Sequence, residues 1–152
     1  MNKFIYAITI LSFLSCNNNM EKGKIFEQGD HLPNEWFTGE AYLSPLIAKD
    51  KNNEFSAGSV TFKPGARTNW HTHPKGQVLM VIDGKGLYQE EGKPAQIIEK
   101  GDVVTIPEGI KHWHGASMLN KMTHIAITNY KGEEQVKWLE PVTDTDYENA
   151  QK

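Results

Sequence analysis

The chain contains GARTNWHTHPKGQVLMVIDG at residues 65–84 and GDVVTIPEGIKHWHGA at residues 101–116, and these two stretches determine which fold the rest can adopt. His71 and His73 are two residues apart. In an extended strand both side chains therefore point to one face, about 6 to 7 Å apart along the chain. Two imidazoles on one face of a strand are a candidate metal site.

Two further side chains complete this candidate site. Gln77 has the same parity as the histidine pair, and the second stretch supplies His112. Neutral imidazole and a glutamine carbonyl oxygen together suit one divalent ion of Mn, Fe, Co, Ni or Zn. The predicted ligands are His71, His73, Gln77 and His112. Gln77 has an alternative role, in which it hydrogen-bonds a ligating histidine without touching the metal.

The spacing of both stretches resembles the two motifs of the cupin superfamily, G-x5-H-x-H-x3-E-x6-G and G-x5-P-x-G-x2-H-x3-N. The matching positions are Gly65, His71, His73, Gly84, Gly101, Pro107, Gly109 and His112. Gln77 stands where the family usually has Glu, and Ala116 stands where Asn is usual. The resemblance implies an all-β fold, a jelly-roll β-barrel also called a double-stranded β-helix.

A closer resemblance covers roughly Trp36 to Tyr147. The runs ARTNWHTHPKGQ, GDVVTIPEGIKHWHGA, MTHIAI and VKWLEPVTDTDY look like the small cupins labelled carboxymuconolactone-decarboxylase-like, a group that includes the manganese-dependent hydroxynitrile lyases. In that group a Gln at the fourth ligand position is normal. The related lyases tend to carry Gln where this chain has Thr128.

The same resemblance implies three catalytic roles. His124 is the expected proton-transfer residue, His114 a polar group near the open metal positions, and Thr68 a hydroxyl contact to the substrate. The residues alone also allow both histidines to serve as packing or support. Thr68 has the opposite parity to His71, so it reaches the site only if the strand is irregular after Gly65.

Other conspicuous side chains have structural interpretations. Trp36, Trp70 and Trp113 are expected as core and subunit-interface aromatics. Arg67 is the single arginine, and it either reaches a substrate carboxylate or pairs with a neighbouring acid.

The N-terminus predicts export. Lys3 precedes an apolar run from Phe4 to Leu14, which is shorter than the about 20 residues that span a bilayer. The single cysteine, Cys16, follows in a lipobox position, which predicts a lipid-anchored lipoprotein of the bacterial cell envelope. The alternative is an incidental thiol after an uncleaved anchor. The predicted organisation is a lipoprotein signal peptide (1–15), a flexible tether (16–35) and one cupin domain (36–152).

The composition limits the partners. Lys plus Arg total 16 against 19 acidic residues, a formal net charge of −3, so nucleic acid is not an expected partner. Membrane association is expected only through the lipid anchor on Cys16. One cysteine cannot form an internal disulfide. We expect a homodimer, because pairing would cover the edge strands of a jelly roll.

Short apolar segments punctuated by Gly and Pro predict strands. They are Glu40–Ala48, Phe55–Lys63, Gln77–Asp83, Leu87–Glu91, Ala95–Glu99, Val103–Ile106 and Met122–Tyr130. Thr143 is the expected N-cap of one short C-terminal helix that extends through Ala150.

The ligand set favours one reaction class. With Gln77 in place of Glu, every protein ligand is neutral, so the metal keeps its full charge and acts as a strong Lewis acid. Such a metal favours addition or elimination at a carbonyl carbon, isomerisation or decarboxylation. The resemblance implies a lyase that acts on a small hydroxy or oxo compound, with manganese as the metal. The alternatives are a cupin dioxygenase, which needs oxygen and a redox metal, and a non-catalytic barrel that binds a small molecule.

Overall fold

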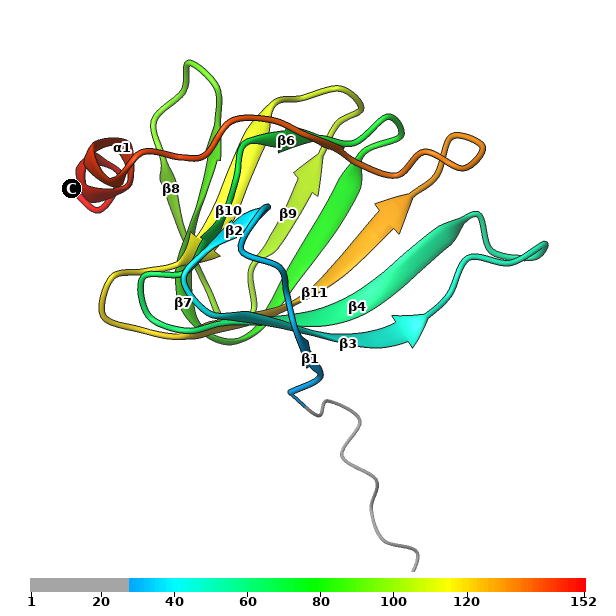
Figure 1. Ribbon diagram of the computed structural model, residues 1–152, viewed down its shortest axis with the longest axis horizontal. Coiled ribbons are helices and arrows are strands. Elements are labelled where there is room, and N and C mark those ends of the chain that lie inside the picture. Colours follow the sequence, from blue (N-terminus) through cyan, green and yellow to red (C-terminus); the bar gives the residue numbers. More distant parts are fainter. Residues whose placement is uncertain (1–27) are drawn as a thin grey trace, which may run out of the picture.

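The short apolar segments form curled antiparallel sheets that enclose one interior, with a short helix at the C-terminal end (Figure 1). The structure is a computed structural model, and it describes residues 28–152. The strands are β1 (Asp30–His31), β2 (Phe37–Thr38), β3 (Ala41–Ile47), β4 (Phe55–Phe62), β5 (Arg67–Thr68), β6 (His71–Thr72), β7 (Gln77–Glu90), β8 (Gln96–Glu99), β9 (Val103–Ile106), β10 (His112–Ala116), β11 (Met122–Asn129) and β12 (Lys137–Trp138), and the helix is α1 (Asp144–Asn149).

The strand order is that of a jelly roll. Hydrogen-bonded neighbours run β1-β3-β4-β11-β7-β10-β5-β2, and every pairing is antiparallel. β8 and β9 add to β7, while β6 lies between β10 and β12. The predicted all-β jelly-roll barrel with a short C-terminal helix is confirmed. The interior is lined by one face of each strand, because side chains alternate across a sheet.

β7 is longer than the sequence predicts. We expected two strands separated by a turn at residues 83–86, but the strand runs unbroken from Gln77 to Glu90. Its first half pairs with β11 and β9, and its second half pairs with β8 and β10. Gly84 allows the bend between the halves: its φ is +77°, and a Cβ there would lie 2.0 Å from the Lys121 carbonyl oxygen. The ladder with β11 skips Ile82, so an irregularity lies directly before residues 83–86, where the strand passes from one sheet to the other.

A break between β5 and β6 allows Thr68 and His71 to face the same cavity, although their positions have opposite parity in a continuous strand. Thr68 and His71 lie on separate two-residue strands, and both line the same cavity. Asn69 occupies the break, where its backbone N–H donates to the Trp36 carbonyl (2.9 Å) and its side chain to the Glu35 carbonyl (3.1 Å). The strand is therefore irregular in the way that the inward placement of Thr68 requires.

The ordered domain begins before residue 36. β1 pairs with β3 through Asp30↔Leu43 and His31↔Tyr42, so residues 30–31 of the expected tether belong to the sheet. The predicted signal peptide and the lipid anchor at Cys16 lie outside the described residues. Within residues 28–152 no helix is long and apolar enough to cross a membrane.

Arg67 anchors the C-terminal segment. Its guanidinium is buried, donates to the Val142 carbonyl (3.0 and 3.3 Å) and to Asp144 (2.6 Å), and lies over the Tyr147 ring. Thr143 caps α1, as expected, by accepting from the backbone N–H of Asp146. Of its two expected roles, Arg67 therefore takes the pairing with an acid, and it lies outside the barrel cavity.

Replacing Arg67 by Met should destabilise the protein by about 1–3 kcal/mol, because the buried Val142 carbonyl loses its donors. The exposed Asp144 carboxylate adds little to this cost. Urea unfolding measures the change. Lys63→Met, at an exposed position shortly before Arg67 in the chain, is the control and should stay within about 0.5 kcal/mol. Equal effects of the two changes would contradict the anchoring role.

Candidate metal centre

Three histidines meet at one side of the barrel interior. His71 lies on β6, His73 follows that strand, and His112 begins β10, where it pairs with His71 across the ladder. One ring nitrogen from each of the three lies within 4.8 Å of the others. All three side chains are buried, with residue exposures of 1%, 3% and 0%. The structure therefore brings together the three histidines predicted as ligands, in a cluster that can hold a metal ion.

Backbone carbonyls set the tautomer of each histidine. Nδ1 of His71 is 2.9 Å from the Asn69 oxygen, Nδ1 of His112 is 2.9 Å from the Ile110 oxygen, and Nδ1 of His73 is 2.6 Å from the Gln135 oxygen. A carbonyl can only accept, so each neutral ring carries its proton on Nδ1. Each Nε2 then keeps a lone pair for a metal.

Gln77 adds an oxygen to this set. Its Nε2 donates to the Thr128 hydroxyl at 2.9 Å, which leaves Oε1 as the free end of the amide. Oε1 of Gln77 and Nε2 of His73 and His112 are buried and find no hydrogen-bond partner in the described part of the chain. Leaving such atoms unpaired costs about 1–3 kcal/mol each. A divalent ion would satisfy all of them, so the residues fit a metal.

The histidines are held neutral. Burial lowers the pKa of His112 to about 4 and the pKa of His71 well below its ordinary value. Burial also lowers the pKa of His73, opposed by favourable interactions with the Gln135 carbonyl and the Gln77 side chain. Neutral imidazole is the form that binds a metal, so these groups are ready to ligate at neutral pH.

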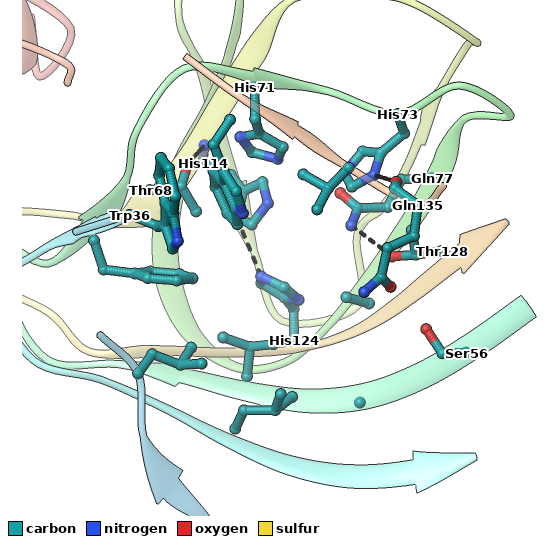
Figure 2. A pocket seen from close by; sticks show the side chains of 18 of the residues that line it. Trp36, Ser56, Thr68, His71, His73, Gln77, His114, His124, Thr128 and Gln135 are labelled. Atoms are coloured by element: carbon teal, nitrogen blue, oxygen red, sulfur yellow. Dashed lines mark hydrogen bonds between the residues drawn. The ribbon is translucent and has the colours of Figure 1, made fainter. Parts of the chain in front are cut away.

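The histidine cluster opens onto a cavity of about 310 Å³ (Figure 2). Among its polar lining residues are Ser56, Thr68, His71, His73, Gln77, His114, His124, Thr128 and Gln135. None of the described lining residues carries a formally charged carboxylate, ammonium or guanidinium group. The remaining wall is apolar, so a metal here would be the dominant charge seen by any bound molecule.

A second pair of histidines, His114 and His124, lines the same cavity, and the His114 ring centroid lies 5.3 Å from that of His71 (Figure 2). Nε2 of His124 is 3.3 Å from Nδ1 of His114, and both rings are buried. Burial lowers the pKa of His124 to about 4 and the pKa of His114 well below its ordinary value. Thr68 accepts a hydrogen bond from the backbone N–H of His114 at 3.2 Å. The three predicted catalytic residues therefore line one cavity together with His71, His73 and Gln77.

Two tryptophans line the cavity in a way that the sequence did not indicate. Trp36, expected as a core or interface aromatic, stacks on Trp138 with ring centroids 5.6 Å apart and 13° between planes. Trp138 also lies 4.8 Å from the His71 ring. It reaches the site because β12 pairs with β6, and Gln135 arrives on the same segment. No periodicity around residues 135–138 signals this long-range pairing.

Neutral histidines and an amide oxygen inside an antiparallel jelly roll define a metal-binding barrel protein. Comparison with known families agrees, since the cupin domain family (Cupin_2) matches residues 58–123. The chain is also 47% identical to an (R)-mandelonitrile lyase from Granulicella tundricola over 115 residues, which cover 76% of this chain and 88% of that protein. The chain belongs to the cupin family.

Solved structures show the same fold. A cupin-like protein from Thermotoga maritima superposes with a TM-score of 0.79 at 44% identity, covering 84% of this chain and 97% of that one. A DMSP lyase from Ruegeria pomeroyi gives a TM-score of 0.57 at 20% identity over 77% of this chain and 60% of its own. The second likeness shows the fold alone.

Chelator-treated protein should gain thermal stability when a divalent metal is added, because the ion binds only the folded histidine cluster. At a free concentration 100 times Kd the gain is about 2.7 kcal/mol. Differential scanning calorimetry with Mn(II) or Zn(II) measures it. His112→Ala should lose the gain, whereas His31→Ala, on the exposed β1, should keep it. A gain that survives in His112→Ala would place the metal elsewhere.

The metal-free protein should become less stable as the pH falls from 7 to 5. His112 and His124 have a pKa of about 4 when folded and about 6.5 when unfolded, so the unfolded chain binds more protons in this window. Their contribution is complete above pH 6.5 and is lost towards pH 4. Urea unfolding at several pH values gives the slope. His124→Gln should reduce that slope, and His31→Gln should not; an unchanged slope in His124→Gln would contradict the assignment.

Proposed function

We propose that this cupin is a metal-dependent lyase that cleaves cyanohydrins, or closely similar uncharged hydroxy compounds, to an aldehyde and a small anion. One observation carries the proposal: residues of the metal cluster and the His114–His124 pair line a single uncharged cavity. The 47% identity to an (R)-mandelonitrile lyase supports the same chemistry. Manganese is the metal we propose, by the resemblance of the ligand set.

The protein ligands determine what the metal contributes. His71, His73, His112 and Gln77 are all neutral, so a bound divalent ion keeps its charge and supplies Lewis acidity towards a hydroxyl or carbonyl oxygen. Among the described residues that line the cavity, no charged side chain offsets that charge. An anionic leaving group is therefore stabilised in this cavity, and a neutral substrate enters without losing the hydration of an ion.

His124 is the proposed base. Its low pKa keeps it neutral near pH 7, so its ring can accept a proton from the substrate hydroxyl, and its Nε2 is the nitrogen that faces His114. Nδ1 of His114 lies 3.3 Å away and orients the ring or passes the proton on. Thr68 fixes the β10 backbone at His114 and offers its hydroxyl to the cavity.

The apolar wall of the cavity determines which substituent the substrate can carry beside its hydroxyl group. Trp36 and Trp138 form an aromatic stack beside His71, which suits an aryl or another planar apolar group. In the described residues no cation lines the cavity to pair with a carboxylate. This arrangement favours a compound such as mandelonitrile over a hydroxy acid.

Benzaldehyde release from racemic mandelonitrile by Mn(II)-loaded protein under nitrogen tests the proposal. We expect release above the protein-free rate with a preference for one enantiomer, read by chiral chromatography. His124→Ala should lower kcat by about 10²–10⁴ because it removes the base. His31→Ala, outside the cavity, should match the parent protein.

Two outcomes would overturn the proposal. Turnover that requires oxygen and iron or copper would make the protein a cupin dioxygenase. Tight metal-dependent binding of small hydroxy compounds with no product would make it a binding barrel, in which replacing His114 or His124 changes affinity alone.

A further inference from the structure

Thr128 on β11 and Gln77 on β7 face each other on neighbouring strands. They are direct partners in the β11–β7 ladder, and the Thr128 hydroxyl accepts the hydrogen bond from Gln77 Nε2 at 2.9 Å. Both side chains are buried, with residue exposures of 7% and 6%. Asn129 ties the strand ends together, because its backbone N–H donates to the Gly76 carbonyl and its side chain to the Lys75 carbonyl. The two chain segments that carry the contact are thus hydrogen-bonded to each other next to it.

In the observed arrangement this contact leaves the oxygen end of the Gln77 amide free. An amide group has a donating end and an accepting end, and only the oxygen has a lone pair for a metal. With Nε2 held by Thr128, Oε1 is directed away from β11 and remains buried without a hydrogen-bond partner among residues 28–152. If the amide turned over, two N–H groups would occupy the metal side, where a cation repels them.

We propose that Thr128 is a positioning residue that fixes the Gln77 amide so that its oxygen completes the metal donor set. Threonine suits this task because a β-branched side chain in a strand has few χ1 rotamers, so the hydroxyl is placed before the metal arrives. The proposal rests on the metal site of the proposed function and is independent of its lyase chemistry. A protein inactive on every cyanohydrin could still show it.

The test compares Thr128→Val, which removes the acceptor but keeps the shape, with Thr128→Ser, which keeps a hydroxyl. We expect Thr128→Val to weaken Mn(II) or Co(II) binding by about 10–100-fold, measured by chelator competition. The visible spectrum of the Co(II) form should also change, because an oxygen ligand is lost or displaced. Thr128→Ser should restore most of the affinity and the parent spectrum.

Thr123→Val is the matched control. Thr123 lies on the same strand, and its hydroxyl contacts Thr61 at 3.0 Å, away from the cavity. This change should leave both the metal affinity and the spectrum unaltered. It separates loss of the Gln77 contact from a general weakening of β11.

A double-mutant cycle then tests whether Thr128 affects metal binding through the Gln77 amide. If Thr128 acts through the amide, Thr128→Val should have no further effect on metal affinity in a Gln77→Ala background, within about 2-fold. The inference is overturned if Thr128→Val binds metal like the parent with an unchanged Co(II) spectrum. It is equally overturned if the loss is as large in the Gln77→Ala background, since Thr128 would then act on the fold alone.

Discussion

Three hydrogen bonds from histidine rings to backbone carbonyls underlie the metal centre. Each carbonyl accepts a hydrogen bond from Nδ1–H, so the ring keeps its proton on Nδ1 and its lone pair on Nε2. Burial alone would leave the rings neutral but free to adopt either tautomer or to rotate. The proposed chemistry depends on this arrangement, because a neutral donor set leaves the metal charge uncompensated in a cavity whose lining is neutral.

The barrel makes these contacts possible by placing irregular backbone next to regular ladders. The break between β5 and β6 provides the Asn69 carbonyl and also turns Thr68 inward. The bend of β7 at Gly84 lets one strand carry Gln77 on one sheet and support β10, with its histidines, on the other. Glycine and short strands therefore create changes of direction that a uniform sheet could not.

The spacing of the two motifs, through its resemblance to the cupin pattern, predicted the fold and grouped His71, His73, Gln77 and His112 into one candidate site. Strand parity alone could not have done so, because a turn separates His73 from Gln77 and His112 lies on another strand. The sequence did not reveal the contribution of Trp138 and Gln135, since pairing between β12 and β6 is a long-range contact with no local signal. Turn residues at 83–86 were misleading because a bulge and a turn use the same amino acids. The metal's identity, the lipid anchor and the homodimer stay predictions.

The partner of His73 is unlike those of the other two ligands. His71 and His112 bond to carbonyls two residues earlier, whereas the Gln135 carbonyl is 62 residues further along the chain. A nascent chain that ends before Gln135 can set two of the tautomers but not the third. Completion of the centre therefore waits for the last part of the domain to be synthesised and folded, which ties metal retention to the integrity of the whole chain.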